Sequence, residues 1–172
     1  NTVSGAVRSA FKHGVQMTTI HASGGREMMA KAAETARQVV QETGRPKPLL
    51  LGVTVLTSLK GADLEEVGMT GDVTAQVLRL AGLAKAAGMD GVVCSPQEIE
   101  VLRKEYGKEL VIVTPGIRPL WAAAQDQKRI MTPAEAVAKG ADYLVIGRPI
   151  TGAPEPNEAF LRIVEELGQI RP

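Results

Sequence analysis

The stretch Gly140-Ala-Asp-Tyr-Leu-Val-Ile-Gly-Arg-Pro149 decides how the rest of the chain is interpreted. It predicts a short apolar strand over 143–146 that ends abruptly in Gly147-Arg148-Pro149. Gly147 has no Cβ, so another group can approach its backbone closely, and Arg148 places a permanent forked cation beside it. A backbone N–H next to a guanidinium, at the carboxyl end of a strand, suits a phosphate group. We therefore predict that Gly147 and Arg148 form one half of a phosphate-binding site.

Composition narrows the class of protein. The chain has 172 residues, 44% of them hydrophobic and 23% charged, which suits one globular domain with a real core. A net charge of +1 and only 3% aromatic residues give no reason to expect a nucleic-acid or acidic membrane partner. The single cysteine, Cys94, fits a reducing compartment, and no apolar run approaches the roughly 20 residues of a membrane span. We expect a cytoplasmic protein.

Outward from the opening stretch, apolar periodicity predicts one helix followed by five strand–helix units. The expected strands are 15–21, 49–56, 91–94, 110–114 and 143–146. The expected helices are 2–13, 27–43, 73–87, 95–106, 132–140 and 157–167, with a short helical turn at 63–67. Strands that are apolar on both faces and alternate with amphipathic helices indicate a parallel sheet covered by helices. An open doubly wound sheet and a barrel both satisfy this pattern.

The residues that follow the strands favour the barrel, because a (β/α)₈ barrel builds its site from the loops after its strands. Polar or glycine-bearing groups follow all five: His21-Ala-Ser23, Thr57-Ser58, Cys94-Ser95, Thr114-Pro-Gly116 and Gly147-Arg148. A barrel of this kind needs eight strands and about 250 residues. We therefore expect residues 1–172 to be a single domain that forms the C-terminal part of an α/β (β/α)₈ TIM barrel. Three further strand–helix units are expected before Asn1, where the chain starts without Met or a signal-peptide pattern.

Six motifs occur in an order and spacing that resemble one known family. They are His21-Ala-Ser-Gly-Gly25, Val53-Thr-Val-Leu-Thr-Ser58, Asp90-Gly-Val-Val-Cys-Ser95, Val113-Thr-Pro-Gly-Ile-Arg-Pro119, Asp126-Gln127 and Asp142-Tyr-Leu-Val-Ile-Gly-Arg-Pro149. Together they resemble bacterial orotidine 5′-phosphate decarboxylase, over its C-terminal two-thirds. The resemblance implies a dimeric TIM barrel without metal or organic cofactor. It also implies conversion of orotidine 5′-phosphate to uridine 5′-phosphate, the last step of pyrimidine nucleotide synthesis.

The same resemblance places the catalytic residues outside this chain. That family has an alternating charged network of Lys and Asp residues, in which the Lys protonates C6 as the carboxylate leaves. Most of the network belongs to an Asp-x-Lys-x-x-Asp motif followed by Ile-Pro-Asn-Thr. Asn1-Thr2-Val3 resembles the end of that signature. The Lys and Asp residues are therefore expected just upstream of Asn1, no residue of this chain is assigned a catalytic role, and the fragment alone is expected to be inactive.

The family's substrate-binding residues can be matched one by one to positions in this chain. Gly147 and Arg148 resemble the family's phosphate-binding pair, and Arg118 matches a further substrate-binding position. Gln127 resembles the loop residue that reaches both phosphate and pyrimidine. The segment 120–124, Leu-Trp-Ala-Ala-Ala, is more apolar than a typical version of that loop.

Three further positions follow from the resemblance. Thr57 and Ser58 match the strand end where the pyrimidine ring lies, and a serine hydroxyl both donates and accepts hydrogen bonds. Thr2 resembles a residue that reaches the ribose of the neighbouring subunit's substrate, so a homodimer is expected.

Two other functions remain open from the residues alone. One is a non-catalytic module that binds a nucleotide or sugar phosphate, and the other is a related sugar-phosphate decarboxylase or aldolase. A metal site is not expected, because His13, His21 and Cys94 lack compact ligand spacing. Cys94 lies in an apolar strand and is expected to be inert.

Overall fold

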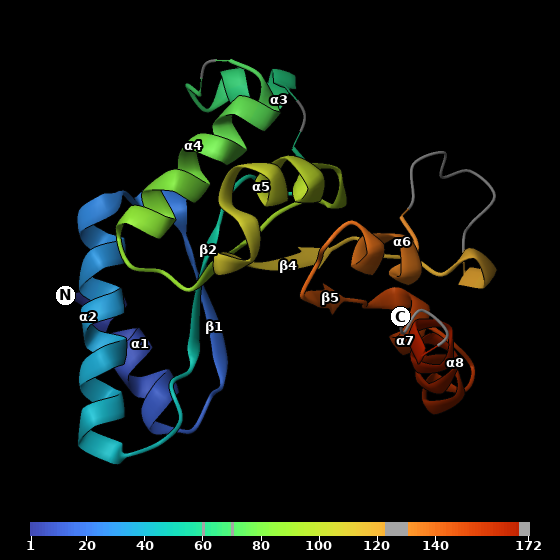
Figure 1. The fold of residues 1–172 in the computed structure, drawn as a ribbon, viewed down its shortest axis with the longest axis horizontal. Helices are drawn as coiled ribbons and strands as arrows, with labels where there is room; N and C mark the ends of the chain where they lie inside the picture. Colours follow the sequence, from blue (N-terminus) through green and yellow to red (C-terminus); the bar gives the residue numbers. More distant parts are fainter. Residues whose placement is uncertain (60, 70, 123–130, 169–172) are drawn as a thin grey trace.

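The computed structural model describes residues 1–59, 61–69, 71–122 and 131–168 (Figure 1). Its strands are β1 (Met17–His21), β2 (Leu49–Val53), β3 (Gly91–Val93), β4 (Val111–Pro115) and β5 (Tyr143–Val145). Its helices are α1 (Thr2–Lys12), α2 (Arg26–Thr43), α3 (Gly61–Glu66), α4 (Val73–Ala86), α5 (Ile99–Tyr106), α6 (Pro133–Ala138), α7 (Arg148–Thr151) and α8 (Pro156–Gly168). Four 3₁₀ turns are η1 (Ala22–Gly24), η2 (Pro96–Glu98), η3 (Gly107–Glu109) and η4 (Leu120–Ala122).

The five strands form one parallel sheet in the order β1-β2-β3-β4-β5. This order excludes the doubly wound alternative, because such a sheet reverses its strand order at a switch point. Because connections between parallel neighbours are almost always right-handed, this consecutive order favours helices on one side of the sheet, as in a barrel wall. Figure 1 shows that the sheet twists strongly, since β1 and β2 run nearly at right angles to β4 and β5. The predicted α/β class and the five strand–helix units are confirmed.

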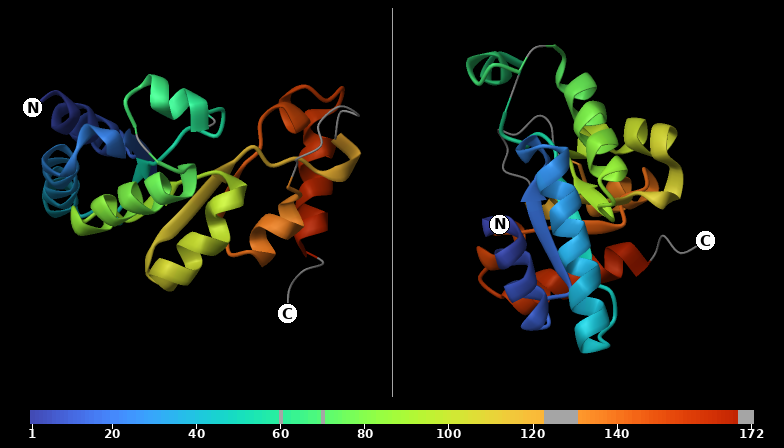
Figure 2. Two further views of the ribbon diagram at one scale, coloured as in Figure 1. Left: turned by 90° about the horizontal axis from the view of Figure 1, so that it is seen from above. Right: turned by 90° about the vertical axis from the view of Figure 1, so that its left-hand side faces the viewer.

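The core lies between the sheet and the helices that follow its strands. Leu50, Val92 and Ile112, from three neighbouring strands, are at most 1% exposed and belong to one hydrophobic cluster. The cluster also takes in side chains from the covering helices, among them Met29, Val77, Leu80, Ile99 and Leu102. Burying side chains of this size accounts for roughly 1.5–3 kcal/mol each. Helix α1 packs against α2, while α8 lies at the opposite end of the molecule (Figure 2, left).

Gly91 allows β3 and β4 to lie side by side. A Cβ built on Gly91 would lie 2.2 Å from the carbonyl oxygen of Val111, much closer than real Cβ contacts. Gly52 plays a milder version of this role, because its Cβ would lie 3.2 Å from the Cβ of Ala84 on α4. Glycine in these strands is therefore required by the close approach of neighbouring atoms.

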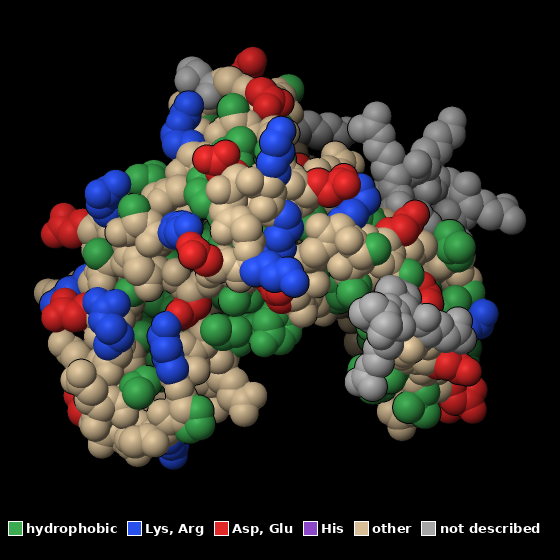
Figure 3. All heavy atoms as spheres, in the orientation of Figure 1, with side chains coloured by type: hydrophobic (Ala, Val, Ile, Leu, Met, Phe, Trp, Pro, Cys, Tyr) green, Lys and Arg blue, Asp and Glu red, His purple; other side chains and the backbone are tan. Residues whose placement is uncertain are grey.

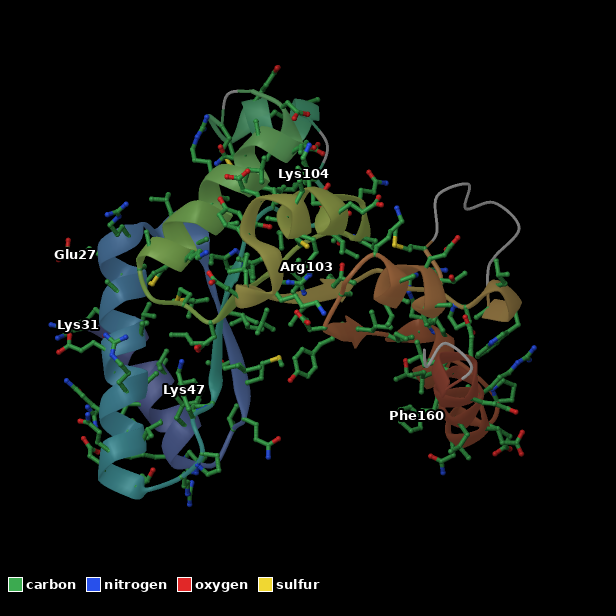
Figure 4. The ribbon with its side chains drawn as sticks, viewed as in Figure 1. Glu27, Lys31, Lys47, Arg103, Lys104 and Phe160 are labelled. Atoms are coloured by element: carbon green, nitrogen blue, oxygen red, sulfur yellow. The ribbon has the colours of Figure 1, made fainter. Side chains whose placement is uncertain are left out.

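A carboxylate fixes the start of β5 against β4. Asp142 accepts a hydrogen bond from the backbone N–H of Ile112 at 2.7 Å and also pairs with the guanidinium of Arg103. Arg103 in turn donates to the carbonyl oxygen of Gly140 at 2.7 Å, and Gly140 has the left-handed φ of 105°. Figure 4 shows Arg103 between α5 and the start of β5. This network sets where β5 begins.

The same arrangement recurs at the start of β3. Asp90 accepts a hydrogen bond from the backbone N–H of Leu50 at 2.9 Å and pairs with Lys47. Asp90 follows Gly88, whose φ is 80°, as Asp142 follows Gly140. In both places a glycine is followed two positions later by an aspartate. The aspartate sets the register of the strand that follows it against the neighbouring strand.

Two predicted elements are wrong in detail. The strand expected over 49–56 ends at Val53, because its partner β3 ends at Val93, the residue paired with Val53. The expected helices leave out residues 148–151, which form the single-turn helix α7. Pro149 lies in the first turn of α7, where proline is tolerated.

The last strand, β5, is exposed on one face, whereas β2 and β4 bury consecutive residues and are covered on both faces. Tyr143 and Val145 of β5 are 47% and 51% exposed, although the apolar sequence of this strand is typical of one covered on both faces. β1 and β5 each pair with one neighbour only in the described sheet. Figure 3 shows the molecule hollowed between the α1–α2 end and the α8 end. Among the described helices, none has the length and apolarity needed to cross a membrane.

Candidate functional site

Arg118 and Arg148 line one hollow at the carboxyl edge of the sheet. Pro115 of β4 and Val145 of β5 are paired in the sheet, and each arginine lies three residues beyond its member of that pair. The two side chains consequently reach the same hollow, which has a volume of about 360 Å³. No carboxylate lines it among the described residues; the other lining residues are Trp121, Ala122, Pro149, Gly152, Ala153 and Pro154. Two cations without a counter-ion on the wall make this a site for an anion.

The backbone around Gly147 and Arg148 is rigidly placed. β5 ends at Val145, and Gly147 caps α7, where its carbonyl oxygen accepts hydrogen bonds from Ile150 (2.8 Å) and Thr151 (3.0 Å). A Cβ on Gly147 would meet no atom within 4 Å, so open space lies beside its Cα. Both Gly147 and Arg148 are exposed, which leaves the guanidinium accessible.

Arg118 is fixed from the other strand. Its backbone N–H donates to the carbonyl oxygen of Met131 at 3.0 Å, and Ile117 forms a parallel bridge with Met131. Met131 therefore lies beside Ile117 and Arg118. Arg118 is half-buried and Ile117 is buried, so the base of this arginine is held firmly.

Thr57 and Ser58 lie elsewhere on the same side of the sheet. Both are exposed after the end of β2, and Thr57 lines a second hollow of about 420 Å³ together with Asp72, Ser95 and Glu98. Burial raises the pKa of the Glu98 carboxyl above its ordinary value, although hydrogen bonds to Ser95 oppose this effect. Because carboxylates line this second hollow, it does not suit a phosphate. The structure does not bring Thr57 or Ser58 into the hollow of the two arginines.

Thr2 and Gln127 complete the predicted set. Thr2 begins α1, is exposed and lines a wide, open hollow between α1 and α2 that also contains Glu27 and Lys31. Figure 4 shows Glu27 and Lys31 on the outer side of α2, far from the α8 end. Gln127 lies outside the described residues.

Other chemistry-bearing groups in the described part of the chain are accounted for. Cys94 is fully buried, and burial raises the pKa of its thiol to about 12. His13 and His21 are both exposed. No group of three or more His, Cys, Asp or Glu residues is placed to hold a metal in the ranges that the structure describes. The residue that sequence reasoning missed is Trp121, which lines the arginine hollow; its signal was the unusually apolar segment 120–124.

The fold and this site define a class. A consecutive parallel sheet with two arginines at its carboxyl edge is the wall of an anion-binding α/β barrel. The model of the orotidine 5′-phosphate decarboxylase / HUMPS family matches residues 1–163. The orotidine 5′-phosphate decarboxylase of Heliobacterium modesticaldum is 54% identical over 170 residues, which cover 98% of this chain and 70% of that protein. That of Actinobacillus succinogenes is 52% identical, with 99% of this chain and 72% of that protein covered.

Solved structures agree with this result. The crystal structure of orotidine 5′-phosphate decarboxylase from Lactobacillus acidophilus has a TM-score of 0.83 and 38% identity, covering 96% of this chain and 69% of that one. The enzyme from Pyrococcus horikoshii OT3 has a TM-score of 0.66 and 26% identity, covering 100% and 69%. The chain belongs to the orotidine 5′-phosphate decarboxylase / HUMPS family, and within it to the bacterial decarboxylases of pyrimidine biosynthesis. Its five-stranded sheet is part of that family's TIM barrel, and the chain spans about 70% of its relatives' length.

Proposed function

We propose that this chain supplies the phosphate-binding part of an enzyme that decarboxylates orotidine 5′-phosphate to uridine 5′-phosphate. The observation that carries the proposal is the hollow that Arg118 and Arg148 share, with no carboxylate among its described lining residues. A phosphate dianion brings two negative charges, which two guanidinium groups can bind through forked hydrogen bonds. The family membership adds that the phosphate belongs to orotidine 5′-phosphate.

The phosphate of this substrate is remote from the bond that breaks. Its binding energy is therefore available to hold the pyrimidine against the catalytic groups and to exclude water. In this proposal Gly147 and Arg148 form the fixed side of the phosphate site, Arg118 lies opposite, and Gln127 reaches phosphate and pyrimidine. Thr57 and Ser58, after β2, contact the pyrimidine ring.

The groups that break the bond are proposed to lie in a segment that precedes Asn1. Asn1-Thr2-Val3 resembles the end of the family's Lys–Asp signature, and the relatives are longer than this chain. The open face beside Tyr143 and Val145 leaves room for further barrel strands. Residues 1–172 are then one part of a single barrel domain, which has no decarboxylase activity without the rest.

Two subunits are proposed to complete each site. Thr2 is exposed on the open α1–α2 face, where a neighbouring subunit can approach it. In the proposal it reaches the ribose of the substrate bound to the neighbour. We also propose a cytoplasmic location, which fits the buried, unpaired thiol of Cys94.

The paired arginines alone would hold any phosphate monoester, so a non-catalytic phosphate binder and a sugar-phosphate decarboxylase are the alternatives. The test is to incubate the complete enzyme with orotidine 5′-phosphate and measure uridine 5′-phosphate and CO₂. We expect stoichiometric release of both. Tight binding of uridine 5′-phosphate without any turnover would favour the binder, and turnover of an open-chain sugar phosphate alone would favour the other decarboxylase.

A further inference from the structure

We propose that Arg162 of α8 is a positioning residue for the anion site, acting by fixing the indole of Trp121 as a wall of the hollow that Arg118 and Arg148 line. The proposal rests on the proposed function, because it concerns the same hollow. The guanidinium carbon of Arg162 lies 4.7 Å from the centroid of the Trp121 ring, which is the geometry of a cation–π contact. Trp121 lines the hollow, whereas Arg162 does not.

The indole depends on this contact for its place. Trp121 belongs to the single turn η4, in which the backbone N–H of Ala122 donates to the carbonyl oxygen of Pro119 at 3.0 Å. Its neighbour Leu120 is 74% exposed and so anchors little. The Nε1–H of Trp121 is buried and has no hydrogen-bond partner among the described residues, so a polar contact of the indole does not hold the ring there. The cation–π contact with Arg162 is the specific interaction that the indole makes within the described part of the chain.

The position of the indole affects the two arginines through the solvent. A half-buried aromatic wall excludes water from one side of the hollow and lowers the local dielectric constant. The attraction between an anion and the guanidinium groups of Arg118 and Arg148 is stronger in such surroundings. Losing the wall should therefore weaken binding of the anion while the groups that do the chemistry stay unchanged.

The contact also joins two distant parts of the chain. Trp121 follows β4, and Arg162 lies in the middle of the last helix. Figure 4 shows α8, marked by Phe160, well apart from α5, which carries Lys104.

Lys104 is exposed and lines none of the hollows described above, so Lys104→Met removes one positive charge without touching the site.

The experiment compares Arg162→Met, Arg162→Lys and Lys104→Met in the complete enzyme, with inorganic phosphate and uridine 5′-phosphate as ligands. We expect Arg162→Met to raise the Kd of both ligands and the KM for orotidine 5′-phosphate by about two- to fivefold, with kcat little changed. Arg162→Lys should restore part of the affinity, and Lys104→Met should leave it unchanged. Trp121 is the only tryptophan of these 172 residues, so its fluorescence, taken as the difference from Trp121→Phe, should shift in Arg162→Met.

A second set of variants distinguishes the contribution of the Trp121 indole from that of the positive charge of Arg162. Trp121→Phe keeps an aromatic face for Arg162 and should bind phosphate nearly as the native protein does, while Trp121→Ala should bind as weakly as Arg162→Met. The effects of Trp121→Ala and Arg162→Met should not add, since both remove the same contact. Equal affinity of Arg162→Met and Lys104→Met, unchanged tryptophan emission, or additive effects would each overturn the proposal. If Arg148→Ala also leaves phosphate affinity unchanged, the proposed function of the hollow fails instead.

Discussion

The carboxylate of Asp142 accepts a hydrogen bond from the backbone N–H of Ile112 at 2.7 Å, and this contact aligns β5 with β4. The alignment pairs Pro115 with Val145, and three residues beyond that pair lie the two arginines of the anion site. A side chain at the amino end of a strand thus determines which groups meet at its carboxyl end.

Asp142→Asn should destabilise the fold. The amide keeps the shape of the carboxylate but loses the negative charge that Arg103 and the Ile112 N–H face. Hydrogen bonds to charged groups contribute about 1.5–3 kcal/mol, so we expect the free energy of unfolding in urea to fall by about that amount. The matched control is Glu105→Gln, an exposed carboxylate on α5. Equal midpoints for the two variants would show that the Asp142 contact contributes nothing.

Gly91→Ala should be more harmful than an ordinary glycine substitution. The new Cβ would lie 2.2 Å from the carbonyl oxygen of Val111, so β3 and β4 would have to move apart. Such overpacking costs about 1–3 kcal/mol, which thermal or urea unfolding resolves. Gly5→Ala is the control, because a Cβ on Gly5, in the middle of α1, meets no atom within 4 Å. Its helix propensity should increase stability by up to about 1 kcal/mol; a loss at Gly5 as large as at Gly91 would contradict the steric explanation.

Glu98 should make the protein less stable as the pH rises, which is the opposite of the usual effect of a carboxylate in a folded protein. Burial raises the pKa of its carboxyl, so the native state keeps the proton at pH values where the unfolded state has lost it. The native protein then binds more protons than the unfolded one, and Glu98 lowers stability as the pH rises from the ordinary glutamate pKa through the raised one. Glu98→Gln should therefore gain stability relative to the native protein over that range. The check is the free energy of unfolding of both proteins, measured from about pH 4 to about pH 8. A difference between the two proteins that does not change with pH would refute this expectation.

Cys94 should be unreactive in the native state. Its side chain is 0% exposed, and burial raises the pKa of the thiol to about 12, so almost no thiolate is present at neutral pH. We expect an aromatic disulfide reagent to modify Cys94 only at the rate of unfolding, and quickly in concentrated urea. Rapid modification without denaturant would show that this part of the sheet opens readily.

Most of the fold was predictable because local signals agreed with the tertiary structure. The helix start at Thr132 is an example: Thr132 Oγ1 accepts from the backbone N–H of Glu135 at 3.2 Å, and Glu135 accepts from the Thr132 N–H at 2.8 Å. A Thr-Pro-x-Glu sequence predicts this capping box directly. The end of β2 was missed, because it depends on where β3, its partner from a distant part of the sequence, ends at Val93.

The site was only half predictable, for a similar reason. Sequence motifs identified Arg118 and Arg148 separately, but their shared hollow follows from the register of β4 and β5. The sequence did not indicate that Thr57 would line a different hollow beside Glu98. Trp121 was noticed as part of an apolar segment, yet its contact with Arg162 of α8 joins residues that are far apart in the sequence. No local pattern reports such a contact.

The central claim is that Arg148 binds the phosphate of the substrate. Steady-state kinetics of Arg148→Ala in the complete enzyme test it most directly, with orotidine 5′-phosphate as substrate and Lys104→Met as the control for a lost positive charge. We predict that Arg148→Ala lowers kcat/KM roughly 30- to 1000-fold, which corresponds to a loss of about 2–4 kcal/mol of transition-state stabilisation. The kcat/KM of Lys104→Met should stay near the native value. A folded Arg148→Ala enzyme with unaltered kcat/KM would contradict the account.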